Sequence, residues 1–315
     1  MIEILSVDVH ESKPNISIPV SRVGIVNFKR PISIKYNSNK MTFTATIDIF
    51  VDIPSSKKGA HISRNIEAID EIFENGNMEF FLDELPEYAV KLVEKLAKKH
   101  DYANHIEVRI RGEIPVEKEA PISKVKSYTL VRVIAGAELC KNGAKITKYR
   151  ILGVELEGMT VCPNSYKMTM DYTREKLKKL GFSDAEINKV LSAVPLSAHN
   201  QRGTGKLIIK SEEKLLIKID ELVRIVEKSM SSPVYPLLKR VDEQRMVIDA
   251  HRNPRFTEDV VRFMIGLLVK NYSNSIPDNA FVIASQRNYE SIHAHDVYSE
   301  IRGVFKELKE EMNID

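Results

Sequence analysis

Four short polar segments hold most of the side chains in this 315-residue sequence that could carry out chemistry. In the fourth, His293 and His295 would point to the same side of an extended chain, and Glu290 lies close to them in the sequence. Imidazole titrates near neutral pH, so paired histidines beside a carboxylate suit metal ligation or proton transfer. The segments are residues 159–165, 195–203, 239–243 and 290–296.

Cys162 and His199 are the candidates in the first two segments. Cys162 follows a predicted strand and precedes a proline, so its thiol can face a cleft, although a buried small hydrophobic role is the alternative. His199 stands in a run of hydrogen-bonding side chains that a core would not need. A cysteine, histidines and a glutamate from distant segments could form a three-ligand metal site that leaves one position for an activated water. No local CxxC pair is present, so spacing alone leaves this hypothesis open.

The third segment, Lys239 to Glu243, is charged throughout except at Val241, and a solvated surface cluster is its simpler interpretation. The common fingerprints of other enzyme classes are missing from the sequence. These are the phosphate loop, GxGxxG after a strand, the GxSxG elbow and the HExxH helix.

Composition indicates an ordinary globular chain. It has 43% hydrophobic and 29% charged residues, and its net charge of +3 is too small to favour nucleic acid or a membrane surface as partner. Glu3 and Asp8 follow Met1 closely, which does not fit a secretory signal, so we expect a cytoplasmic protein. The two cysteines, Cys140 and Cys162, are too few for a disulfide framework.

The periodic pattern predicts paired strands and paired helices in each half of the chain. Apolar residues alternate from Met41 to Ile53, which is typical of a half-buried strand. Strands that arrive in pairs favour an α+β fold of antiparallel sheets with helices on one face, in two similar units, residues 1–140 and 141–315. Two short helices broken at Gly181 form an insertion near 172–194. Other expected strands are 106–110, 128–134, 151–156, 207–209 and 280–284, and expected helices are 63–73, 82–99, 215–228, 254–270 and 296–311.

The segments together resemble the type IB GTP cyclohydrolases, and more closely their archaeal, methanopterin-pathway branch. The resemblance extends over nearly the whole chain and rests on several short motifs that are specific only jointly. These are Pro14-Asn15-Ile16, Ser21 to Gly24, Lys58 to Arg64, Ser197 to Arg202, Tyr235 to Glu243, Asn253 to Asp259 and Glu290 to His295.

This resemblance implies a tunnelling fold (T-fold) of two tandem modules, assembled as a homodimer or homotetramer with sites between subunits. It implies that Cys162, His199 and Glu243 bind a catalytic metal, one per subunit. Fe2+ is expected, and Zn or Mn would also suit these ligands. It further implies that Glu290, His293 and His295 surround the reacting ring of GTP.

Substrate contacts follow from the same resemblance. Glu258 would accept two N–H bonds from guanine, a pattern that adenine cannot offer, although it would also favour a helix N-terminus electrostatically. Arg202, Lys239 and Arg240 are candidates for the triphosphate because its charge needs cationic partners.

The sequence departs from bacterial members in two places. Asn164 stands where they usually carry a second cysteine, and the interval from Cys162 to His199 is longer because of the 172–194 insertion. This favours the archaeal product, 7,8-dihydroneopterin 2',3'-cyclic phosphate with formate and diphosphate. The alternatives are the bacterial product, dihydroneopterin triphosphate, a related enzyme with Cys162 as covalent nucleophile, and a non-catalytic purine- or pterin-binding protein.

Overall fold

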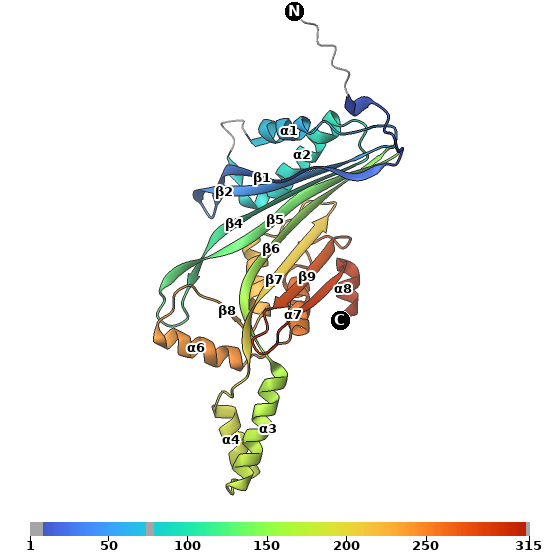
Figure 1. Ribbon diagram of the computed structural model, residues 1–315. Helices are drawn as coiled ribbons and strands as arrows, with labels where there is room; N and C mark the ends of the chain where they lie inside the picture. The colour runs from blue at the N-terminus through green and yellow to red at the C-terminus, as the bar shows by residue number, and fades with distance from the viewer. Residues whose placement is uncertain (1–8, 74–78, 313–315) are drawn as a thin grey trace, which may run out of the picture. The chain divides into compact units, whose positions relative to one another are not determined.

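The computed structural model describes residues 9–73 and 79–312, and the chain divides into two compact units (Figure 1). Unit 1 comprises Met1–Glu113, Val133–Leu152 and Lys210–Leu216. Unit 2 comprises Ile114–Arg132, Gly153–Ile209 and Ile217–Asp315. Each unit is assembled from segments that are not contiguous in the sequence. The division at residue 140 expected from the sequence stays a prediction.

Unit 1 begins with a short helical turn, η1 (Val9–Glu11), and a long antiparallel hairpin of β1 (Val20–Tyr36) and β2 (Asn39–Ile53). The turn uses Asn37 and Ser38 at φ 47° and 66°, a region that asparagine tolerates better than most residues. The alternation predicted for β2 is confirmed from Phe43 onward, because the odd-numbered apolar positions are buried while most intervening ones are not. The buried apolar residues are Phe43, Ala45, Ile47, Ile49, Val51 and Ile53.

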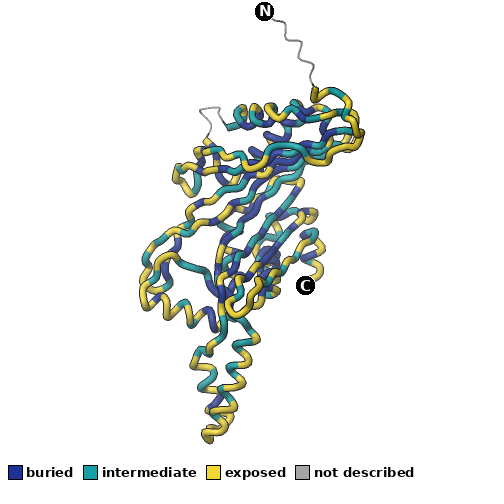
Figure 2. Tube along the Cα trace, in the orientation of Figure 1, coloured by how far each residue is buried: buried dark blue, intermediate teal, exposed yellow. Residues whose placement is uncertain are grey.

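Two helices of unit 1 pack against each other, α1 (Ser63–Phe73) and α2 (Leu85–Lys99). Between them lie β3 (Phe80–Phe81), which pairs in parallel with β1, and the turn η2 (Leu82–Glu84). The apolar face predicted for α2 is buried, as the dark segments in Figure 2 show. Burying each such side chain contributes about 1.5–3 kcal/mol to folding. That face consists of Ala89, Leu92, Val93 and Leu96.

Unit 2 combines short strands with most of the helices. Its strands are β7 (Asn200–Ser211), β8 (Ser232–Pro233), β9 (Phe281–Asn288) and β10 (Val297–Val304). Its helices are α3 (Pro163–Lys179), α4 (Asp184–Ala193), α5 (Ile219–Ser229), α6 (Arg240–His251), α7 (Thr257–Tyr272) and α8 (Phe305–Glu311).

Three long strands contribute many residues to both units, and β7 contributes its last two residues to unit 1. The three are β4 (His105–Glu119), β5 (Lys126–Asn142) and β6 (Lys145–Val161). Strands hydrogen-bond in the order β10-β9-β7-β6-β5-β4-β2-β1-β3, and β8 pairs with β6. The site residues discussed below follow or precede β6, β7 and β9, which are neighbours in this order.

The α+β class is confirmed, but the expected tunnelling fold of two tandem modules is wrong. The strands form one ten-stranded sheet of mixed direction, since β3 is parallel to β1 while β2 is antiparallel to it. Alternation in the sequence is clear only over the most apolar parts of the middle strands, such as 128–134 and 151–156. Strands of that length predicted separate sheets. Both segments are fragments of 17-residue strands.

The helix expected over residues 296–311 is also wrong in its first half. Residues Val297–Val304 form β10, which pairs antiparallel with β9, and only Phe305–Glu311 are helical. Exposed and half-buried residues alternate along β10, which is the two-residue period of a strand. The period of this segment is therefore that of a strand and not of a helix.

Two helices flank Gly181, as the pattern predicted, and lie side by side as a pair that projects from the strands of unit 2 (Figure 1). Gly181 has φ +88°, and Ser183 begins α4 with a capping box to Glu186. Every residue of α3 is exposed or partly exposed. Among the described helices none is long and apolar enough to cross a membrane.

Candidate active site

The ends of three neighbouring strands meet in unit 2, and they position the main candidates. Cys162 follows the end of β6, His199 precedes the start of β7, and Glu290 follows the end of β9. The backbone N–H of Cys162 donates to the carbonyl of His199 at 3.0 Å, and Tyr289 donates to the carbonyl of Arg202 at 2.9 Å. Strand pairing therefore brings together residues that are far apart in the sequence.

Cys162 is the N-cap residue of α3, and Pro163 takes the first helical position, where a missing N–H costs nothing. The Sγ atom accepts a hydrogen bond from the backbone N–H of Ser165 at 3.4 Å. The Ser165 hydroxyl in turn accepts from the backbone N–H of His199 at 3.4 Å. The half-buried thiol is thus fixed beside His199 rather than packed as a core residue.

His199 is surrounded by polar partners. Its Nδ1 lies 3.1 Å from Oε1 of Gln201 and 3.9 Å from Oε2 of Glu290, whose side chain is only 7% exposed. The His293 ring lies edge-on to the His199 ring with centroids 6.3 Å apart, and His295 stacks on His293 at 5.2 Å. An imidazole, a nearly buried carboxylate and two further imidazoles can pass protons over short distances.

A pocket of about 850 Å³ lies next to these residues. Helix α3 supplies one wall, and the segments before α7 and between β9 and β10 supply others. Its size suits a nucleotide-sized ligand. The lining residues are Cys162, Pro163, Asn164, Ser165, Met168, Thr169, Tyr172, His199, Phe256, Ile292 and His293.

The remaining predicted residues lie outside this lining. Glu243 is exposed on α6, and Glu258 is exposed on the first turn of α7, where its Oε2 accepts from the Thr257 hydroxyl at 2.9 Å. Arg202 is 69% exposed and contacts Glu157 at 3.3 Å. Lys239 and Arg240 are exposed at the start of α6. Their predicted contacts with substrate or metal stay predictions.

Two of the three expected metal ligands, Cys162 and His199, line this pocket. A thiol and an imidazole are the donor types that Fe2+ and Zn2+ accept. The third expected ligand, Glu243, is not among the lining residues. Within residues 9–73 and 79–312, no group of three or more His, Cys, Asp and Glu side chains is close enough to hold a metal ion.

Asp242, next to Glu243, has a clear structural role. Its buried carboxylate accepts hydrogen bonds from the backbone N–H groups of Ile122, Ser123 and Lys239 and from the Ser123 hydroxyl, at 2.5 to 2.9 Å. Burial raises the pKa of Asp242, but the hydrogen bonds outweigh it and hold that pKa well below its usual range. The charged segment 239–243 is therefore partly an anchor between α6 and the β4–β5 turn.

His251 and Gln201 are polar residues of the site that the sequence did not single out. His251, at the end of α6, is nearly buried and contacts the carbonyl of Ala198 through Nε2 at 3.3 Å and that of Val247 through Nδ1 at 2.9 Å. It ties α6 to the loop that precedes His199. The sequence signal for Gln201 was the density of polar side chains near His199, and the run of residues 195–203 does not extend to His251.

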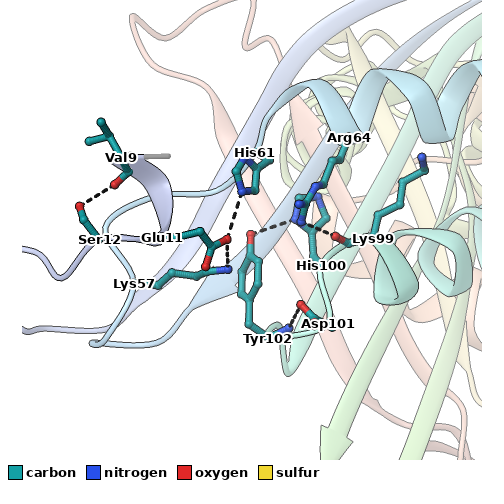
Figure 3. Close-up of polar contacts among 10 residues, drawn as sticks. All are labelled: Val9, Glu11, Ser12, Lys57, His61, Arg64, Lys99, His100, Asp101 and Tyr102. Carbon is teal, nitrogen blue, oxygen red and sulfur yellow. Dashed lines mark hydrogen bonds and ion pairs between the residues drawn. The ribbon is translucent and has the colours of Figure 1, made fainter. Parts of the chain in front are cut away.

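The motif from Lys58 to Arg64 lies in unit 1, and its residues His61 and Arg64 belong to the polar cluster of Figure 3. Glu11 accepts from Lys57 at 2.6 Å and lies 3.1 Å from Nε2 of His61. The hydrogen bonds from Lys57 and His61 lower the pKa of Glu11. Arg64 donates to the carbonyl of Lys99 at 2.6 Å. The contacts of Glu11 hold the N-terminal segment against the loop before α1, and the contact of Arg64 joins α1 to the end of α2.

His100 is the buried member of the same cluster (Figure 3). Its ring nitrogens contact the Tyr102 hydroxyl and Oδ1 of Asn65, both at 2.9 Å. Burial lowers the pKa of His100 to about 4, and the nearby charge of Arg64 adds to the effect. The ring is therefore neutral at physiological pH and serves unit 1 as a structural residue.

A family model described as type I GTP cyclohydrolase folE2 matches residues 7–299. This chain belongs to that family. The resemblance inferred from the short motifs is thus confirmed, and it extends over both units.

Relatives in the family match over almost their full length. The chain is 38% identical to GTP cyclohydrolase MptA of Methanococcus aeolicus over 309 residues, which cover 97% of this chain and 99% of the relative. It is 40% identical to GTP cyclohydrolase MptA of Methanosphaera stadtmanae over 309 residues, which cover 96% and 97%. The corresponding protein of Methanosarcina mazei is 36% identical over 310 residues, which cover 97% of each chain.

Among solved structures, the chain resembles uricase from Arthrobacter globiformis. The TM-score is 0.52 at 8% sequence identity, over 92% of this chain and 96% of that one. A hyper-thermostable AgUricase mutant gives a TM-score of 0.50 at 8% identity, over 90% and 92%. At such low identity the likeness concerns the fold alone. It supports a uricase-like α+β architecture in place of the expected tandem modules.

Proposed function

We propose that this chain is a GTP cyclohydrolase, which opens the imidazole ring of GTP and releases formate. Membership in the folE2 family and relatives named GTP cyclohydrolase MptA support the reaction class. The structural observation that carries the proposal is the convergence of Cys162, His199 and His293 on one pocket. A cysteine and two histidines there suit hydrolytic chemistry better than simple ligand binding.

The residues around the pocket divide into two roles. Glu290, His293 and His295 are proposed to move protons while the ring opens, because imidazole gains and loses a proton near neutral pH. Glu258 is proposed to accept the N1 and 2-amino hydrogens of guanine. It lies two residues after Phe256, which lines the pocket, and this proximity supports the assignment.

We propose that the enzyme requires a divalent metal, Fe2+ in the first place and Zn2+ or Mn2+ as alternatives, held by Cys162 and His199. When bound, such an ion supplies a water that is acidic enough to act as nucleophile near neutral pH. Glu243 remains the proposed third ligand. A reducing compartment such as the cytoplasm would suit both ferrous iron and a free thiol.

The site is proposed to be completed by a second copy of the chain in a homodimer or homotetramer. The exposed position of Glu243 and the exposed Met168, Tyr172 and Phe256 on the pocket lining support this. Mixing inactive Cys162→Ala and Glu243→Gln chains tests it directly. If one site uses both copies, hybrid oligomers regain part of the activity, whereas unmixed variants stay inactive.

The proposed product is 7,8-dihydroneopterin 2',3'-cyclic phosphate, formed with formate and diphosphate. The archaeal relatives and the long interval between Cys162 and His199 support it over the triphosphate. Anaerobic protein reconstituted with Fe2+ should release formate from GTP, and phosphate analysis of the pterin separates the two products. Absence of formate from folded, iron-loaded protein would refute the proposal. Activity that survives complete chelation would instead favour Cys162 as a covalent nucleophile.

A further inference from the structure

Gln201 links His199 to the interior of unit 2. It is the second residue of β7, and only 7% of its surface is accessible to solvent. Its Oε1 lies 3.1 Å from Nδ1 of His199, and its Nε2 donates to the hydroxyl of Thr160 at 3.1 Å. Thr160 lies on β6 and is completely buried. The amide is therefore held at both ends by groups that have little room to move.

We propose that Gln201 is a positioning residue that keeps the proton of neutral His199 on Nδ1. A neutral imidazole carries one N–H, and its location is set by the partner of each ring nitrogen. An amide oxygen accepts a hydrogen bond and cannot donate one, so Oε1 facing Nδ1 requires the proton there. The lone pair then lies on Nε2. The role of that lone pair rests on the function proposed above, whereas the position of the proton does not.

A rotated amide is the alternative arrangement. It would place the NH2 group against Nδ1 and the oxygen against Thr160, whose hydroxyl could then donate. Glu290 decides between the two, because its Oε2 lies 3.9 Å from the same Nδ1. A lone pair at Nδ1 would face this negative charge, whereas an N–H would be attracted to it. Two acceptors around Nδ1 therefore favour the N–H at that nitrogen.

The consequence for the pocket is a histidine with a fixed tautomer. His199 lines the pocket. Its backbone hydrogen bonds to Cys162 and Ser165 fix the position of its main chain. With Nδ1 turned toward Gln201 and Glu290, the other ring nitrogen is available to the pocket. Both metal ligation and proton acceptance require a lone pair at that nitrogen.

The tautomer can be measured by NMR on metal-free protein labelled with 15N-histidine, at a pH of about 8.5 where imidazole is neutral. His199→Gln assigns the signal. We expect the Nδ1–H form in the parent and in Gln201→Glu, which retains an acceptor. Gln201→Leu should weaken this preference most, because only Glu290 then remains as an acceptor near Nδ1. Thr160→Val should weaken the preference for the Nδ1–H form, because the Gln201 amide can then rotate. If Gln201→Leu does not fold, Thr160→Val serves as the test variant in its place.

Gln286→Leu is the matched control, since Gln286 is also a buried strand glutamine but hydrogen-bonds to Asn288. It should leave the His199 tautomer unchanged. In anaerobic titrations with Fe2+, the dissociation constant should rise about 10–100-fold in Gln201→Leu and much less in Gln201→Glu. A proton on Nε2 in the parent, or equal tautomer populations in the parent and Gln201→Leu, would overturn the proposal. Failure of every form, including the parent, to convert GTP would refute the proposed function and leave the tautomer result standing.

Discussion

The backbone N–H of Cys162 donates a hydrogen bond of 3.0 Å to the carbonyl oxygen of His199. This bond closes the excursion of residues 163–198, which contains α3 and α4, and returns the chain to the sheet where it left. The two residues are neighbours because β6 and β7 are neighbours. The long insertion between them therefore leaves the core of the site intact and adds a wall to the pocket.

Replacing Cys162 should separate its structural and chemical roles. Cys162→Ser retains an N-cap acceptor for α3, so the unfolding temperature should change little. Formate release should fall more than 100-fold, and bound iron, measured by elemental analysis, should fall with it. Cys140→Ser is the control, since Cys140 lies on β5 in unit 1 and should affect neither quantity. Full iron retention in Cys162→Ser would remove the thiol from the metal site.

Glu290→Gln removes the negative charge beside His199 while it preserves the shape of the side chain. Because the carboxylate is nearly buried and 3.9 Å from Nδ1, its charge acts strongly on the imidazole. We expect kcat to fall by roughly 100-fold or more, with a smaller change in KM. Glu300→Gln on β10 is a matched exposed control. Equal kcat values for Glu290→Gln and the parent would contradict a role in proton transfer.

Glu258→Gln should change substrate selection more than turnover. Loss of a charge-assisted acceptor costs about 1.5–3 kcal/mol, which corresponds to a rise in KM for GTP of roughly 10–100-fold. Inosine triphosphate lacks the 2-amino group, so its KM should rise less. Steady-state kinetics with both nucleotides test this. A parallel loss for both would indicate that Glu258 does not read the 2-amino group.

Asp242 and Glu243 should give opposite results although they are adjacent. Asp242→Ala removes a buried carboxylate that accepts four hydrogen bonds, so the unfolding temperature should fall by roughly 5 °C or more. Glu243→Ala changes an exposed side chain and should leave the unfolding temperature almost unchanged while activity is lost. Thermal unfolding and formate assays on both variants provide the comparison. Full activity in Glu243→Ala would refute its proposed role as a ligand.

The lowered pKa of His100 predicts that the free energy of unfolding falls in mild acid. Its pKa is lowered from 6.5 to about 4 in the folded protein, so the unfolded chain binds more protons between these values. The stabilisation is complete above pH 6.5 and is lost as pH falls toward 4, by up to about 3 kcal/mol. Urea unfolding from pH 7 to 4.5 should show a shallower pH dependence in His100→Gln. His105→Gln, which changes a more exposed ring, should behave like the parent.

Much of the candidate site could be predicted before the fold was known. Cys162, His199 and His293 were selected because thiol and imidazole side chains in polar runs have few structural uses, and they line one pocket. Gln201 and Thr160 could not be selected in this way. Glutamine and threonine occur throughout a protein surface, and only the distance to His199 gives these two a role.

The sequence by itself determined the family, the α+β class, the individual helices and strands with strong periodicity, and the identity of the chemical side chains. These depend on residue type and on periodicity over neighbouring positions, and both can be read directly from the sequence. Only the tertiary structure decided that the strands form one sheet, that residues 297–304 pair with β9, and that Asp242 is an anchor. Pairing partners and burial depend on residues distant in the sequence, and no local pattern contains them.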